Sequence, residues 1–346
     1  MIYRYSYHRF FVTILIVAIF VEAGFLLMVQ PIQMNSENGV PSQREGVWST
    51  QIRVMGPKLA YKSFIATYSQ DSLNEQHTRA HEFGADLYHT VGLEGIEVCD
   101  RSFQFGCFHE FLGLAIAEKG LPVVSELNDV CLRKHSGDVT GCQHGVGHGV
   151  AGYYGYDDEA LTEALAVCDR LDSSTRVGGC YGGVFMEYNL RTLLSVDGEP
   201  PRTFYEEKGP HDPCVTLDTA HQAPCFFWQP QWWQSVFFDE WSTQVSRNAM
   251  AVRMGVWCGD IVDKDNKSLC FRGIGTNIPA VTDWDEIETK YLCDSMPTQR
   301  ATIECRAGAA SVFFGQISVG QTPWGMCNDL SEKDRITCIS IAQNPR

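Results

Sequence analysis

Pairs of histidines are the residues of this chain that are best suited to bind a metal ion. His144 and His148 are four residues apart, so on a helix they share one face. His77 and His81 have the same spacing. Imidazole groups in such pairs can bind transition metals such as zinc, copper, iron or manganese. The spacing therefore indicates metal or ligand binding as one function of the chain.

The cysteine repeats indicate which histidines lie together. His109 is two residues after Cys107, and His144 is two residues after Cys142. The two histidines thus occupy the same position in consecutive repeats. Equivalent positions in a stacked repeat array lie along one surface. We therefore expect His109 and His144 to be neighbours in space.

Two further residues extend this surface in opposite directions. The segment His-Glu-Phe-Gly at 81–84 resembles His109-Glu110. His81 therefore takes the position of His109 in the repeat before it. Glu187 falls near the position of His148 in the next repeat. A groove built in this way has the following candidate metal ligands: His81, His109, His144, His148 and Glu187. The alternative interpretation is that the histidines pack at helix starts and hydrogen-bond backbone groups.

Catalytic motifs are incomplete or missing in the sequence. Residues 81–85 read His-Glu-Phe-Gly-Ala, whereas the zinc protease helix needs a histidine where Ala85 stands. The sequence contains no Gly-x-Ser-x-Gly elbow, P-loop or dinucleotide-binding fingerprint. These absences leave the catalytic residues unassigned.

The fourteen cysteines form seven pairs with a regular spacing. The pairs are Cys99/Cys107, Cys131/Cys142, Cys168/Cys180, Cys214/Cys225, Cys258/Cys270, Cys293/Cys305 and Cys327/Cys338. First cysteines recur every 32 to 46 residues, the period of a helix-turn-helix unit in a solenoid. An even, periodic set of cysteines favours structural disulfides and an oxidising compartment.

The helical periodicity and the cysteines together predict an all-α fold. We expect an αα-hairpin solenoid or superhelix in which a disulfide staples each hairpin. A helix should end at each first cysteine and another should begin at each second cysteine. Apolar spacing and acidic first turns predict helices over 57–68, 73–91, 107–118, 158–168 and 283–293. Glycines three residues after four of the second cysteines should allow close approach between helices.

An aromatic run at 226–241 distinguishes the repeat that begins at Cys214. Its tryptophans include Trp228, Trp232 and Trp233. Large rings of this kind could form a stacking platform for a glycan or another flat ligand. Packing of the rings between helices is the favoured interpretation.

The N-terminal region carries a targeting signal. Residues 10–29 are apolar, apart from Glu22, and follow basic residues, as in a membrane anchor with its N-terminus in the cytoplasm. A cleaved signal peptide is the alternative. We expect a signal anchor or signal peptide over 1–30, a flexible stalk over 31–48 and a repeat domain over 49–346. The domain would lie outside the cytoplasm, extracellular or periplasmic, and would be secreted if the signal is cleaved.

Three motifs of the sequence resemble those of an uncharacterised family of bacterial signal-anchored, cysteine-paired helical repeat proteins. The resemblance rests on His-Glu-x-Gly, Cys-x-His-Gly-x-Gly-His-Gly and Cys-Tyr-x-Gly-Val-Phe-Met-Glu, and covers residues 77–188 best. The family stretch reads His-Glu-Ile-Gly-His, so Ala85 departs from it. The resemblance implies repeats and export, and it implies no activity.

These observations favour a binding protein, whose partner is a protein, a glycan or a small ligand. The formal net charge of −15 argues against nucleic acid, because phosphate binding needs a basic face. The cofactor predicted by the histidines is a transition metal such as zinc, copper or iron. A metal-dependent enzyme that uses the histidines is one alternative. A purely structural or cell-surface interaction protein is the other.

Overall fold

The computed structural model of the chain describes residues 46–135, 137–172, 175, 177–194, 200–237, 242–315 and 324–343. These ranges contain fourteen α-helices and no β-strand, which confirms the predicted all-α fold. Residues 45–346 form one compact unit by themselves. The predicted anchor at 10–29 and most of the predicted stalk lie outside the described residues.

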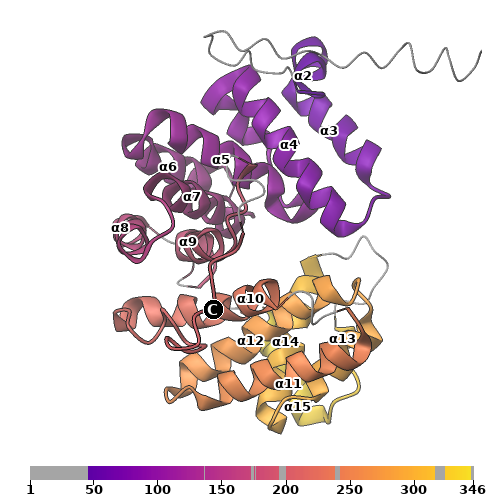
Figure 1. Cartoon of the computed structure of the whole chain (residues 1–346). Coiled ribbons are helices and arrows are strands. Elements are labelled where there is room, and N and C mark those ends of the chain that lie inside the picture. Colours follow the sequence, from indigo (N-terminus) through magenta and orange to yellow (C-terminus); the bar gives the residue numbers. More distant parts are fainter. Residues whose placement is uncertain are drawn as a thin grey trace, which may run out of the picture. The chain divides into compact units, whose positions relative to one another are not determined.

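The helices follow one another along the chain, and the longest connection, residues 191–218, joins α9 to α10 (Figure 1). The first eight are α2 (Ser49–Met55), α3 (Pro57–Tyr68), α4 (Leu73–Val91), α5 (Gly106–Lys119), α6 (Val124–Lys134), α7 (Val139–Tyr154), α8 (Asp158–Cys168) and α9 (Gly179–Leu190). The last six are α10 (Thr219–Val236), α11 (Gln244–Asp260), α12 (Lys264–Val281), α13 (Glu286–Asp294), α14 (Gln299–Gly315) and α15 (Glu332–Gln343). Three of these helices, α3, α4 and α8, have the predicted bounds.

Local capping explains why these boundaries could be predicted. Ser72 and Glu75 form a reciprocal capping box at the start of α4. Pro57 begins α3, where its missing N–H leaves no hydrogen bond unmade. Helix α13 begins later than predicted, at Glu286. The reason is that Asp283 and Trp284 have φ angles of +51° and +62°, which a helix cannot contain.

All seven predicted disulfides are formed, with Cα–Cα distances of 5.4 to 5.8 Å. No cysteine is left as a free thiol. The predicted pairing is therefore confirmed for every pair: Cys99–Cys107, Cys131–Cys142, Cys168–Cys180, Cys214–Cys225, Cys258–Cys270, Cys293–Cys305 and Cys327–Cys338.

The first cysteines do not all lie at the end of a helix. The prediction is wrong for Cys99, Cys214 and Cys327, which lie in turns or at the end of 3-10 segments. The other four first cysteines lie in the last turn of their helix, as expected. A disulfide needs only that the two Cα atoms come within about 4.4–6.8 Å, and a turn can meet that requirement as well as a helix.

The second cysteines also vary in their position. Helices α5 and α9 begin one residue before Cys107 and Cys180, which agrees with the prediction. Cys142 is the fourth residue of α7 and lies in its first turn. The prediction is wrong for the remaining four second cysteines, because each is the seventh residue of its helix and thus lies in the second turn. These four are Cys225 of α10, Cys270 of α12, Cys305 of α14 and Cys338 of α15. The polar residues before each of them belong to the helix and not to the connecting turn.

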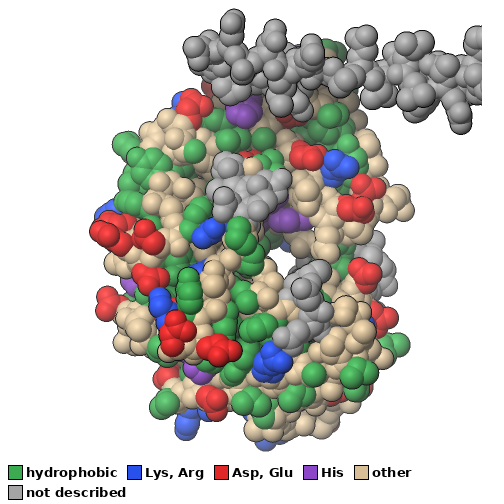
Figure 2. Space-filling model, viewed as in Figure 1, with side chains coloured by type: hydrophobic (Ala, Val, Ile, Leu, Met, Phe, Trp, Pro, Cys, Tyr) green, Lys and Arg blue, Asp and Glu red, His purple; other side chains and the backbone are tan. Residues whose placement is uncertain are grey.

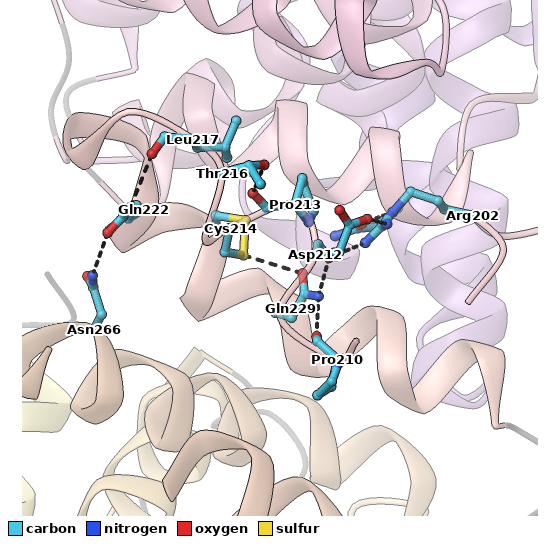
Figure 3. The surroundings of a disulfide bond; sticks show 12 residues. Arg202, Pro210, Asp212, Pro213, Cys214, Thr216, Leu217, Gln222, Gln229 and Asn266 are labelled. Carbon is cyan, nitrogen blue, oxygen red and sulfur yellow. Dashed lines mark hydrogen bonds and ion pairs between the residues drawn. A yellow bond between two sulfur atoms is a disulfide. The ribbon is translucent and has the colours of Figure 1, made fainter. Parts of the chain in front are cut away.

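Side chains hold the turn around Cys214 where a helix was expected. Gln229 of α10 donates hydrogen bonds to the carbonyl oxygens of Pro210 at 2.8 Å and Asp212 at 2.7 Å (Figure 3). Arg202 forms an ion pair with Asp212 at 3.0 Å. These contacts fix Cys214 next to its partner without a helix in this repeat.

The helices that carry the second cysteines form one continuous row. Each packs against the next in the order α5, α7, α9, α10, α12, α14 and α15, and α4 packs on α5 at the start. Helices α6, α8, α11 and α13 each pack beside this row. The row accounts for the repeat pattern, because it buries the apolar face that a single hairpin would leave exposed.

Glycines bring neighbouring helices of the row into backbone contact, as predicted. A Cβ atom on Gly145 would lie 2.8 Å from the carbonyl oxygen of Phe108, closer than packed atoms allow. Gly183 lies against the carbonyl oxygen of His144 in the same way, and Gly273 and Gly308 repeat the contact in later repeats. Equivalent side chains on neighbouring helices are therefore held unusually close.

Acidic side chains are spread over the face of the molecule seen in Figure 2, in agreement with the net charge of −15. Within the described ranges, no helix combines the length and the apolar character that a bilayer span requires.

Candidate functional site

Five histidines converge where α4, α5 and α7 pack together. They are His77 and His81 of α4, His109 of α5, and His144 and His148 of α7, and are called the histidine cluster below. The ligand nitrogens of His77, His81 and His109 lie within 4.8 Å of one another, as do those of His109, His144 and His148. The structure thus brings all four predicted histidines together and adds His77.

The helix packing places these side chains in one spot. Gly84 of α4 lies against the carbonyl oxygen of Cys107, and Gly145 of α7 lies against that of Phe108. Helix α5 is therefore enclosed by α4 and α7 at its first turn. His109, on that turn, is the histidine that faces both neighbours.

The histidine cluster is largely buried, and three of its imidazoles, those of His77, His109 and His144, are uncharged at neutral pH. His148 is fully buried, and His81, His109 and His144 are 4%, 4% and 8% exposed. Burial, reinforced by neighbouring imidazoles, lowers the pKa of His77 and of His144 to about 3. It also holds the pKa of His109 well below its usual value. Neutral imidazoles have the free lone pair that a metal ligand needs.

Backbone carbonyls orient two members of the cluster. The Nδ1 atom of His77 lies 3.0 Å from the carbonyl oxygen of Phe103, and that of His144 lies 3.2 Å from the carbonyl oxygen of Gly178. A carbonyl only accepts, so each Nδ1 carries the hydrogen. Each Nε2 then presents its lone pair to the cluster. The Nε2 of His77 lies 3.3 Å from the Nε2 of His81, and the Nε2 of His144 lies 3.4 Å from the sulfur of Met186.

Carboxylates orient two other members. The Nδ1 atom of His81 lies 3.4 Å from Glu110, and the Nδ1 atom of His148 lies 2.9 Å from Glu187. Metal-bound histidines in proteins characteristically donate their second ring N–H to such a carboxylate or to a carbonyl. Four of the five imidazoles are thus held in the orientation typical of metal ligands.

Glu187 was predicted as a direct ligand, and the structure places it behind His148 instead. It also accepts hydrogen bonds from Thr192 N–H at 3.0 Å, the Thr192 hydroxyl at 2.7 Å and the Tyr156 hydroxyl at 2.8 Å. Burial raises the pKa of Glu187, but the hydrogen bonds from His148, Thr192 and Tyr156 outweigh it and bring the pKa below its usual value. Glu187 is therefore a charged group that positions His148.

One buried nitrogen in the cluster has no partner. Among the described residues, the Nε2 atom of His148 makes no hydrogen bond, although it is shielded from solvent. Buried polar atoms are nearly always satisfied, and an orphaned one points to a bound ion or water. The donor set and this unpaired atom fit a transition metal.

Three residues of the site, His77, Glu110 and Met186, are not among the ligands predicted from the sequence. His77 was noticed for its spacing to His81 but not assigned to the groove. Glu110 follows His109 directly in the chain but orients His81 of α4, a contact that depends on how α4 packs on α5. Met186 carried no signal in the sequence, because its contact with His144 depends on how α9 packs on α7.

The tryptophans of α10 have different positions. Trp228 borders the histidine cluster, with its ring centroid 5.0 Å from that of His144 and its N–H bonded to the Val177 carbonyl at 2.9 Å. Trp232 and Trp233 are 1% and 0% exposed. Their N–H groups donate to backbone carbonyls at 2.6 and 2.8 Å. This placement supports the packing interpretation for these two rings.

Comparison of the chain with protein-family models, with curated proteins and with solved structures gives no match.

Proposed function

We propose that the chain is an exported metal-binding protein whose histidine cluster holds transition metal ions. The observation that carries this proposal is the convergence of five imidazoles, four of which have their outer nitrogen bonded to a carboxylate or a carbonyl. A purely structural role would leave no reason for imidazoles to face one another. It would also leave the buried Nε2 of His148 unexplained.

The ligand chemistry favours copper or zinc. Imidazole suits both metals, and a thioether such as Met186 favours copper in its reduced state. Thiolate ligation is excluded because all fourteen cysteines are in disulfides. Hard oxygen-seeking ions such as calcium or magnesium do not match a site of nitrogen donors.

The burial of the cluster favours an ion that stays in place. Catalytic zinc sites keep one coordination position open to water or substrate. In the histidine cluster, His148 is fully buried and three more members are at most 8% exposed. A resident ion, which stabilises the fold or exchanges electrons, therefore suits the site better than hydrolysis of a large substrate.

Export follows from the redox state of the cysteines. Seven disulfides with no free thiol suggest an oxidising compartment outside the cytoplasm. We further propose that residues 10–29 anchor the chain in a membrane with the repeat domain on the outer side.

Elemental analysis of the full-length protein tests the proposal. The protein is purified oxidised, without an affinity-tag metal, next to a double variant with His144→Gln and His148→Gln. We expect the wild type to contain copper or zinc and the variant to contain clearly less of it, with unchanged helicity. His89→Gln, at an exposed histidine of α4, is the matched control and should keep the metal. A wild type that neither contains metal nor takes up added Cu(II) or Zn(II) would refute the proposal.

A further inference from the structure

His109 occupies a position that no other histidine of the cluster shares. It belongs to both groups of three imidazoles, one with His77 and His81 and the other with His144 and His148. Its ring centroid lies 5.2 and 5.3 Å from those of His77 and His81, and 5.3 and 4.5 Å from those of His144 and His148. His109 is thus the centre of the cluster.

The hydrogen bonds of His109 also differ from those of the other four. Each of those rings has one nitrogen bonded to a carboxylate or a backbone carbonyl. Within the described part of the chain, the hydrogen-bond partner of His109 is another ligand, the Nε2 of His81, at 3.4 Å from its Nδ1. No carboxylate or carbonyl there ties up either of its nitrogens. Both ring nitrogens therefore remain for ligation.

The supporting residues on the two sides of His109 are also paired. Glu110 orients His81 in the first group, and Glu187 orients His148 in the second. The segment after α9 holds both carboxylates, because Leu194 N–H donates to Glu110 at 2.9 Å and Thr192 N–H donates to Glu187 at 3.0 Å. One short segment thus supports two half-sites, each with a negative charge.

We infer that the cluster is a two-metal centre in which His109 bridges the ions as an imidazolate. One ion would be bound by His77, His81 and one nitrogen of His109, and the other by His144, His148 and the second nitrogen. The inference rests on the proposed metal-binding function. Metal–nitrogen bonds of about 2.0–2.1 Å on both sides of one imidazole ring fit two ions that share it.

The charges and protons of this arrangement balance. Binding of the second divalent ion displaces the remaining N–H proton of His109, which passes to bulk water. The imidazolate and the two carboxylates then carry three negative charges against the four positive charges of two divalent ions. A bridge of this kind couples the unpaired electrons of two Cu(II) ions, which gives it a spectroscopic signature.

Copper titration followed by electron paramagnetic resonance tests the inference on the full-length apo-protein. We expect two Cu(II) ions to bind per chain, with a signal that grows during the first equivalent and falls during the second. Replacement of one copper by Zn(II) should restore the signal without any mutation. In His109→Gln the second equivalent should either fail to bind or add to the signal, whereas His89→Gln should behave as the wild type.

The outcomes separate the two claims. A single Cu(II) per chain, or two that give the sum of independent signals, would overturn the bridge and leave the metal-binding function standing. A protein that binds no Cu(II) would overturn both. Because the wild-type titration and the zinc substitution need no variant, a His109→Gln protein that failed to fold would not remove the test.

Discussion

Glu187→Gln removes a buried negative charge next to the histidine cluster while keeping the shape of the side chain. The carboxylate accepts the Nδ1–H of His148 at 2.9 Å, and two groups of Thr192, the Leu193 N–H and the Tyr156 hydroxyl supply its other hydrogen bonds. A glutamine oxygen facing His148 can keep the bonds from His148 and Thr192. The Tyr156 hydroxyl can rotate to accept from the new amide. We therefore expect the variant to fold.

The effect on metal affinity follows from the hydrogen bond that changes. A bond to a charged acceptor contributes about 1.5–3 kcal/mol and one to a neutral acceptor about 0.5–1.5 kcal/mol. The hydrogen bond that orients the His148 ring is thus weakened by about 1–1.5 kcal/mol. This loss corresponds to a roughly tenfold lower metal affinity. Loss of an orienting carboxylate behind a metal-bound histidine typically weakens binding by about 10- to 100-fold.

A competition titration with a chelator measures this change. Wild type, Glu187→Gln and a control, Glu304→Gln, are compared for Zn(II) and Cu(II) affinity. Glu304 of α14 is also fully buried, but it lies outside the histidine cluster. Its carboxylate forms an ion pair with Arg272 of α12 at 2.9 Å. We expect the affinity to fall for Glu187→Gln alone. An equal affinity for wild type and Glu187→Gln, with both folded, would refute the assignment of Glu187 as the group that positions His148.

Three further predictions concern the stability of the fold. Gly183→Ala should destabilise the fold by about 1–3 kcal/mol in urea denaturation, since its Cβ would collide with the neighbouring backbone, whereas Gly259→Ala should not. Replacing Cys131 and Cys142 together by alanine should lower the free energy of unfolding by about 2–4 kcal/mol. The apo-protein should lose several kcal/mol of stability as the pH falls from about 6.5 towards 3. Over that range His77 and His144 bind protons in the unfolded chain but stay neutral in the folded protein, where their pKa is about 3. A urea midpoint that does not change with pH would contradict this prediction.

The parts of the fold that depend on residues close together in the sequence could be predicted. Capping at Ser72 and Pro57 sets the starts of α4 and α3, and short cysteine spacings fix the disulfides. The start of α13 could not be predicted, because two consecutive residues, Asp283 and Trp284, adopt left-handed backbone angles that their types do not require.

The candidate site was predictable in its members more than in their roles. Superposition of the repeats predicts that His109 and His144 lie together, because equivalent positions stack. It does not show which ring nitrogen faces inward, so Glu187 was interpreted as a ligand although it contacts the outer nitrogen of His148. The carbonyl that orients His77 belongs to Phe103, whose φ of +52° has no sequence signal.

Anomalous diffraction from crystals of the metal-loaded protein shows whether the histidine cluster binds a metal ion. Data collected on both sides of the copper or zinc absorption edge locate the ion without reference to any variant. We expect the ion to lie within about 2.0–2.3 Å of ring nitrogens of the histidine cluster, with the Nε2 of His148 among them. Density only at surface residues, or an empty cluster in crystals soaked with metal, would contradict this expectation.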